Sequence, residues 1–166
     1  MTDDDEAALV RAAQGGDTLA MNDLLDVLAP YVARICAPIA FASGPDAAQE
    51  TLIAVFRSLR SLRDPRALRG WVRSIAVREA VRAAERDARA VPMDITDRPA
   101  AHDGELSADV RDQLARMAPA QRAVLVLREL EGLSEEQTAR LLRVAPGTVK
   151  SRLHRARDTF RKAWTA

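Results

Sequence analysis

Apolar residues recur every three or four positions in three segments before residue 90, and this spacing constrains the fold more than any other feature. The three stripes consist of Met21, Leu24, Leu25, Leu28, Val32 and Ile35, then of Ala48, Leu52, Val55, Leu59 and Leu62, and then of Leu68, Trp71, Val72, Ile75 and Ala76. Such spacing places apolar side chains on one face of an α-helix. Only 7 glycines, 8 prolines and 4% aromatic residues argue against a barrel or sandwich of short strands. The sequence therefore predicts an all-α fold.

The apolar pattern stops at residues 90–104, where Pro92, Pro99 and Gly104 stand among several acids. It resumes in further stripes, of which the last consists of Val149, Leu153, Ala156, Phe160 and Trp164. We therefore expect two small helical domains, 1–89 and 105–166, joined by a flexible linker at 90–104. A long ordered loop on a single domain is the alternative.

Composition and the ends of the chain exclude several other classes of protein. The chain is 48% hydrophobic and 30% charged, as folded proteins are, and no apolar stretch approaches the roughly 20 residues of a membrane span. The start, MTDDDEAALV, is acidic where a signal peptide is basic. The single cysteine, Cys36, cannot form an internal disulfide, and we expect it to be a buried thiol. These features predict a cytoplasmic protein with no membrane insertion.

Charge occurs in alternating blocks, although the formal net charge is only +1. Residues 57–89 hold ten arginines against four acids, and residues 140–162 hold eight bases against Asp158. Residues 1–30 and 94–112 are acidic by contrast. Such segregation predicts two basic surfaces for a polyanion, and nucleic acid is the favoured one. A further hypothesis is that the acidic N-terminus covers a basic surface in the free protein.

The last two predicted helices have the pattern of a helix-turn-helix unit. Ser134 is followed three residues later by Gln137, the signature of a capping box, and Pro146 suits the first position of the final helix. When the apolar stripe of that helix faces inward, Thr148, Ser151, Arg152 and Arg155 face outward and Lys150 flanks them. Hydrogen-bonding side chains combined with arginine suit a helix that enters the major groove. A solvated basic helix in a bundle is the alternative.

The C-terminal segment resembles a known family. LARMAPAQRAVLVLRELEGLSEEQTARLLRVAPGTVKSRLHRAR (114–157) is similar to region four of an extracytoplasmic-function (ECF) sigma factor, the bacterial transcription-initiation subunit. DAAQETLIAVFRSL (46–59) and LRGWVRSIAVREAVR (68–82) resemble region two more loosely. The resemblance covers nearly the whole chain. It implies an alternative sigma factor that binds core RNA polymerase and directs it to a subset of promoters.

The resemblance also implies roles for particular residues. Asp46, Gln49 and Glu50 share one helical face, and in the family this face takes part in binding core RNA polymerase. The distal promoter element would be read by Thr148, Lys150, Ser151, Arg152 and Arg155. Arginines in two helical rows would follow the phosphates of the single-stranded proximal element, and the predicted contacts are Arg66, Arg69, Arg73, Arg78 and Arg82.

Three positions depart from the family pattern, and two rival functions stay open. Leu68, Glu79 and Ala83 stand where the family commonly has Phe, Asn and Asp, and these differences bear on promoter choice and melting. The rivals are a free-standing helix-turn-helix regulator and a sigma-like decoy that titrates an anti-sigma factor. We expect no catalytic activity, no cofactor, no metal and no small-molecule substrate. Promoter DNA and core RNA polymerase are the implied partners, and the family often has an anti-sigma factor as well.

Overall fold

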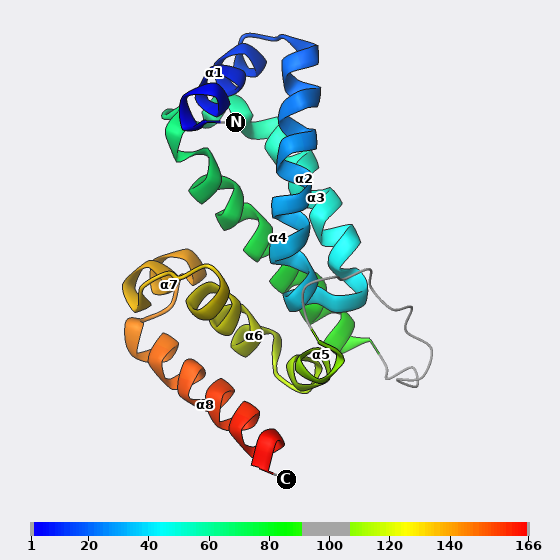
Figure 1. Ribbon diagram of the computed structural model, residues 1–166, viewed down its shortest axis with the longest axis vertical. Coiled ribbons are helices and arrows are strands. Elements are labelled where there is room, and N and C mark those ends of the chain that lie inside the picture. Colours follow the sequence, from blue (N-terminus) through cyan, green and yellow to red (C-terminus); the bar gives the residue numbers. More distant parts are fainter. Residues whose placement is uncertain (1, 91–106, 166) are drawn as a thin grey trace.

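Every regular element of the described chain is helical (Figure 1). The computed structural model describes residues 2–90 and 107–165, the last three of these by their backbone only. We call 2–90 the N-terminal unit and 107–165 the C-terminal unit. The all-α prediction is confirmed. Most of the predicted linker, 91–104, lies outside the described residues.

The N-terminal unit contains four α-helices. They are α1 (Asp3–Gln14), α2 (Thr18–Ala40), α3 (Gly44–Ser58) and α4 (Leu68–Arg89), and short 3-10 turns at Phe41–Ser43, Leu59–Ser61 and Pro65–Ala67 lie between them. Helices α2, α3 and α4 pack side by side around one apolar core, and α1 packs on α2. The predicted stripes of α2 and α4 supply this core, because Leu24, Leu28, Val32, Ile35, Leu68 and Val72 are fully buried.

One of the N-terminal acids caps α1, and a glutamine ties the other end of this helix to the rest of the unit. Thr2 and Asp5 form a capping box, in which the Thr2 side chain accepts from the Asp5 amide and the Asp5 carboxylate accepts from the Thr2 amide. These hydrogen bonds hold the pKa of Asp5 below its usual value. At the other end of α1, the Gln14 amide donates to the carbonyls of Leu59 and Leu62, at 2.9 and 2.8 Å. Helix α1 is thereby tied to the chain that follows α3.

The buried face of α3 differs from the first half of the predicted stripe, whereas Val55, Leu59 and Leu62 are buried as predicted. Ala47, Thr51 and Val55 are buried, whereas Ala48 and Leu52 are only half-buried. The Thr51 hydroxyl donates to the Ala47 carbonyl at 2.7 Å, so its polar atom is satisfied inside the core. Thr51 is therefore buried where the apolar pattern predicted that Leu52 would be.

Helix α2 is more apolar than the sequence analysis allowed for. The helical run Thr18–Ser61 contains an 18-residue window with mean hydropathy 1.6, which by length and composition alone could cross a membrane. The prediction that no apolar stretch approaches such a length was therefore too strong. Core packing accounts for part of this composition, because Leu24, Leu28, Val32 and Ile35 of the α2 stripe are fully buried, whereas Met21 and Leu25 are half-buried. Cys36 lies on this buried face as predicted, and burial raises the pKa of its thiol to about 12.

The C-terminal unit also consists of helices. They are α5 (Ala108–Ala115), α6 (Pro119–Leu125), a π-helical turn (Val126–Leu130), α7 (Glu135–Leu142) and α8 (Pro146–Thr165). Its own buried clusters are small, and one of them contains only Val124, Ala139, Val149 and Leu153.

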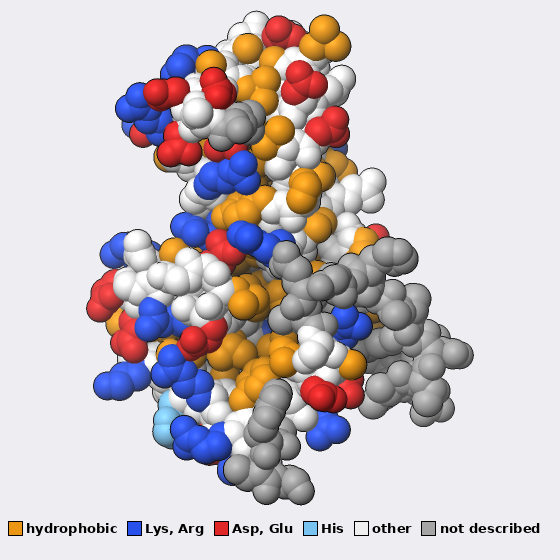
Figure 2. All heavy atoms as spheres, in the orientation of Figure 1, with side chains coloured by type: hydrophobic (Ala, Val, Ile, Leu, Met, Phe, Trp, Pro, Cys, Tyr) orange, Lys and Arg blue, Asp and Glu red, His pale blue; other side chains and the backbone are white. Residues whose placement is uncertain are grey.

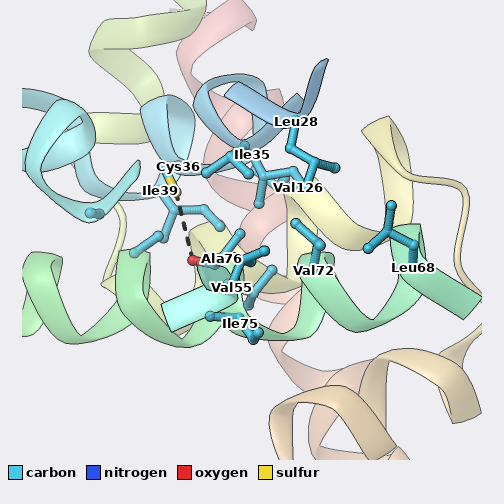
Figure 3. Close-up of a cluster of buried hydrophobic side chains, with 14 of the residues drawn as sticks. Leu28, Ile35, Cys36, Ile39, Val55, Leu68, Val72, Ile75, Ala76 and Val126 are labelled. Atoms are coloured by element: carbon cyan, nitrogen blue, oxygen red, sulfur yellow. Dashed lines mark hydrogen bonds between the residues drawn. The ribbon is translucent and has the colours of Figure 1, made fainter. Parts of the chain in front are cut away.

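The apolar core continues from the N-terminal unit into the C-terminal unit. Ala123, Val126, Leu127 and Leu133 belong to the same cluster of buried residues as α2, α3 and α4. Figure 3 shows Val126 among side chains of α2 and α4. The two predicted halves of the chain are therefore packed against each other.

Arg122 crosses the boundary between the units and is buried, with 7% of its surface exposed. Its guanidinium donates to the Ile39 carbonyl of α2 at 2.8 Å and to the Met117 carbonyl at 2.7 Å. It also stacks over the Phe41 ring, 4.8 Å from the ring centroid. A buried guanidinium whose donors reach both units holds them in one relative position.

Candidate nucleic-acid and polymerase interfaces

The helix-turn-helix unit forms as its caps predict. The Ser134 hydroxyl accepts from the Gln137 amide at 3.1 Å, and the Gln137 side chain accepts from the Ser134 amide at 2.8 Å. Gly132 just before it has φ +64°, a backbone conformation that glycine adopts without strain. Helix α7 ends at Arg143, which is left-handed with φ +55°. The sharp turn at Arg143 sets the direction of α8.

Helix α8 presents a polar and basic face to solvent. Val149, Leu153 and Ala156 are buried as predicted, with at most 4% of their surface exposed, and Phe160 is half-buried. On the outward side, Lys150, Ser151 and Arg155 are exposed, and Thr148 and Arg152 are half-buried. All five residues predicted to read the distal element therefore lie on the accessible side of this helix.

The bases of this face are available to a ligand. Within the described residues, Lys150, Arg152 and Arg155 make no ion pair with an acid. Figure 2 shows basic side chains beside the pale-blue histidine at the α8 side of the C-terminal unit. Arg157, further along α8, pairs instead with Glu129 at 2.6 Å. A short positive track thus begins near the N-terminus of α8, where side chains best reach base edges.

The first arginine row of the N-terminal unit, Arg66, Arg69 and Arg73, is less available to a ligand. Each of its guanidinium groups forms an ion pair with a carboxylate. Arg66 pairs with Asp4 at 3.0 Å, and Nε of Arg69 donates to Glu6 at 2.9 Å. Figure 2 shows red and blue side chains interleaved around α1. Arg73 pairs with a residue of the C-terminal unit, Glu131, at 3.4 Å. The hypothesis that N-terminal acids cover a basic surface is supported at the first two of these arginines.

The second predicted row is more open. Arg78 and Arg82 are exposed on α4, and Arg82 pairs with Glu79 one turn earlier at 3.0 Å. Glu79 is one of the positions that depart from the family pattern, and here it partly neutralises the row. Ala83 is buried, so a larger polar residue at this position would have to enter the core.

The predicted polymerase-binding face on α3 is solvent-exposed. Asp46, Gln49 and Glu50 are all exposed and lie near the N-terminal end of the helix. The sequence did not single out Phe56, which is 58% exposed and lies seven residues, or two helical turns, after Gln49. Phe56 directly follows Val55 and lies off the buried stripe, and this position could have predicted its exposure. A large exposed aromatic on the helix that carries these exposed polar groups is typical of a protein-binding surface.

An apolar pocket in the C-terminal unit also escaped the sequence patterns. It has a volume of about 350 Å³, and its lining includes Val110, Leu114, Leu125, Leu130 and Phe160 from α5, α6, the π-helical turn and α8. Leu130 is 56% exposed at this pocket.

Among the described residues no group of three or more His, Cys, Asp or Glu side chains is placed to hold a metal ion.

The arrangement defines an all-helical protein with a basic helix-turn-helix, and comparison with known proteins refines this class. Residues 107–160 match the family model for sigma-70, region 4. The chain is 31% identical over 173 residues to the ECF RNA polymerase sigma-E factor of Haemophilus influenzae, and the match covers 92% of each protein. It is 37% identical over 128 residues to the ECF RNA polymerase sigma factor SigE of Mycolicibacterium smegmatis, covering 70% of this chain and 49% of that protein.

Solved structures show the same fold. The sigma factor RpoE of Bartonella quintana, solved in complex with the anti-sigma factor NepR, superposes with a TM-score of 0.66 and 23% identity, over 87% of this chain and 96% of that one. The chain therefore belongs to the family of ECF RNA polymerase sigma factors. The predicted family and the predicted role as an alternative sigma factor are confirmed.

Proposed function

We propose that the chain acts as an alternative sigma factor that binds core RNA polymerase, directs it to a subset of promoters and helps to open the DNA. The observation that carries this proposal is the outward face of α8, where Lys150, Arg152 and Arg155 make no ion pair with an acid of the described residues. The protein would act in the cytoplasm, supply recognition and leave catalysis to the polymerase, with no cofactor of its own.

The C-terminal unit would read the distal promoter element as duplex. Thr148 and Ser151 lie near the N-terminus of α8, where short hydroxyl side chains reach base edges in the major groove. Arg152 is suited to bidentate contact with a guanine, because its guanidinium carries parallel donors. Lys150 and Arg155 are exposed on the same helix and would contact flanking phosphates.

The N-terminal unit would bind core polymerase and the proximal element. Asp46, Gln49 and Glu50 offer carboxylate and amide groups to a basic partner surface. Phe56, two helical turns after Gln49, adds an exposed apolar side chain. The proximal element would follow Arg66, Arg69, Arg73, Arg78 and Arg82 as a single strand. We propose that 1–89 and 105–166 work as two binding domains joined by 90–104. An anti-sigma factor is a further proposed partner, because the related RpoE was solved in complex with one.

Co-elution with bacterial core RNA polymerase on size exclusion tests the proposal. The wild-type chain is expected to form a 1:1 complex. The double substitution Asp46→Lys and Glu50→Lys should abolish this complex, because it reverses the charge of the exposed α3 face while leaving the core untouched. The matched control is Asp23→Lys with Asp26→Lys, which makes the same charge change at exposed positions of α2 and should leave the complex intact.

The alternatives give different results in the same experiment. A folded wild-type chain that does not bind core polymerase but does bind duplex promoter DNA would be a free-standing regulator. A chain that binds neither would be a decoy for an anti-sigma factor. Equal loss of the complex in both double variants would attribute the effect to net charge and remove the α3 face from the proposal.

A further inference from the structure

Four side chains of the N-terminal unit converge at the boundary with the C-terminal unit. They are Tyr31 and Arg34 of α2 and Arg69 and Arg73 of α4, and we call them the Tyr31 cluster. The guanidinium of Arg69 lies 5.1 Å from the Tyr31 ring centroid, and that of Arg34 lies 5.5 Å from it. An aromatic ring between cations is a suitable surface for an anionic ligand, because the ring fixes the guanidinium groups without neutralising them.

One carboxylate of the C-terminal unit, that of Glu131, occupies this cluster. Its Oε1 lies 3.3 Å from Arg34, and its Oε2 lies 3.4 Å from both Arg73 and the Tyr31 hydroxyl. Only 7% of the Glu131 side chain is exposed. Burial, and then the charge of Glu131, raise the pKa of Tyr31, so its hydroxyl keeps its proton and remains a donor.

The backbone holds Glu131 in this place. Glu131 follows the π-helical turn directly and precedes Gly132, whose φ of +64° turns the chain. Leu133 is buried in the core shared with the N-terminal unit, with 7% of its surface exposed. The carboxylate is therefore delivered to the cluster by the same contact that packs the two units together.

The carboxylate is an imperfect occupant. All three of its contacts are 3.3–3.4 Å, whereas charge-assisted hydrogen bonds are usually about 2.7–2.9 Å. Nε of Arg73 is buried and has no hydrogen-bond partner among the described residues. Within the part of the chain that the structure describes, the ion pairs of Arg34, Arg69 and Arg73 involve two carboxylates, those of Glu131 and Glu6. A phosphate group, with more acceptor oxygens than a carboxylate, would satisfy more of these donors.

We propose that the Tyr31 cluster is a phosphate-binding site for a DNA strand, and that Glu131 occupies it as an internal substitute for phosphate while the two units are packed together. This inference rests on the proposed function, in which Arg69 and Arg73 contact the proximal element, and adds Tyr31 and Arg34 to that surface. DNA is favoured over a small anion because Arg66 extends the same helical row, so successive phosphates find successive arginines. Strand binding and packing of the units thus exclude each other.

Binding of single-stranded DNA to the full-length chain, without polymerase, tests the site. The probe is a short fluorescein-labelled oligonucleotide, and its Kd is measured by anisotropy at low and moderate salt. Glu131→Gln removes the competing charge at nearly constant volume and should tighten binding about tenfold, which corresponds to about 1.4 kcal/mol. The radius of gyration from small-angle scattering should rise in the same variant, because the contact between the units weakens.

The matched control is Glu129→Gln. It makes the same charge change two residues earlier, but Glu129 pairs with Arg157 inside the C-terminal unit and does not touch the cluster. Arg73→Gln, introduced alone and together with Glu131→Gln, shows whether the gained affinity passes through the cluster. The inference expects a gain for Glu131→Gln that exceeds the gain for Glu129→Gln and that disappears in the double variant.

Each other result overturns the inference in a recognisable way. Equal gains in the two single glutamine variants would mean that net charge alone controls binding. No gain for Glu131→Gln, combined with weaker binding for Arg73→Gln, would leave the N-terminal unit as a DNA-binding surface and remove Glu131 as its competitor. No change in either variant would remove the cluster as a DNA site, whereas the α3 face would still stand on the polymerase co-elution experiment.

Discussion

The two basic surfaces carry nearly equal charge in the sequence but differ in availability. The block at 57–89 has ten arginines against four acids, and the block at 140–162 has eight bases against one. Arg66, Arg69 and Arg73 are nevertheless paired with acids from other parts of the chain, whereas Lys150, Arg152 and Arg155 pair with no acid in residues 2–90 and 107–162. Counting charge along a chain therefore locates a basic surface without telling whether that surface is open.

The acids that pair with Arg66, Arg69 and Arg73 do not contribute equally to stability. Arg66 and Asp4 are both largely exposed, and such a pair contributes little to stability. Glu131 is almost fully buried, so loss of its partners would leave a desolvated charge. The ion pair of Glu131 with Arg73 is therefore the stronger of these contacts. It persists only while the two units are packed together.

The largest expected effect breaks the packing of the units. Arg122→Ala should lower the free energy of unfolding by about 3 kcal/mol, because it leaves buried carbonyl groups of both units without a donor. Urea unfolding followed by circular dichroism measures this change. Arg116→Ala, an exposed position of the preceding segment, is the control and should stay within about 0.5 kcal/mol of wild type. An equal, small effect for both would mean that Arg122 does not hold the units together.

The second effect contrasts the open surface with the covered one. Arg152→Ala should weaken binding of the free chain to promoter duplex by about 2 kcal/mol and relax specificity at one base pair. Arg66→Ala should change the same affinity far less, because its guanidinium already pairs with Asp4. Anisotropy on a set of duplexes with single base changes measures both. A uniform loss across all duplexes would make Arg152 a phosphate contact.

The third effect concerns the core of the N-terminal unit, where burial raises the pKa of Cys36 to about 12. The unfolded thiol titrates near its ordinary pKa of 9.0, so above pH 9 the unfolded state loses protons that the folded state keeps. Stability should therefore fall as pH rises from 9 towards 12, by about 1.4 kcal/mol at pH 10. Cys36→Ala should lose this part of the dependence. Identical pH profiles for the two proteins would show that the thiol is not protected.

The smallest effect concerns the C-terminal unit. Ser134→Ala removes the side-chain acceptor of the capping box and should lower stability by about 1 kcal/mol. Thermal unfolding measures it, and Ser134→Asp, which keeps an acceptor at the same place, should recover most of the loss. A Ser134→Ala variant as stable as wild type would mean that packing of α7 and α8 alone sets the turn.

Much of the C-terminal unit could be read from the sequence because its signals are local. The cap at Ser134, the chain turn at Gly132 and the buried stripe of α8 each depend on residues within a few positions of one another. The buried face of α3 shows where a prediction from hydrophobicity alone fails. The apolar pattern predicted that Ala48 and Leu52 are buried, but the structure buries Thr51. Its burial is possible because its hydroxyl donates to the carbonyl of Ala47, four residues earlier.

The sequence by itself determined most of the helices, the cap at Ser134 and the helix-turn-helix, because period and capping act within one helix. The residues assigned to DNA and polymerase stay a prediction. Only the tertiary structure decided which of these residues are covered. Arg122 reaches a carbonyl 83 positions away, and Glu131 reaches arginines 58 and 97 positions away. No periodicity encodes such pairs, since they depend on how two separately patterned units pack. In the proposed site, that packing decides when Arg73 is free to bind.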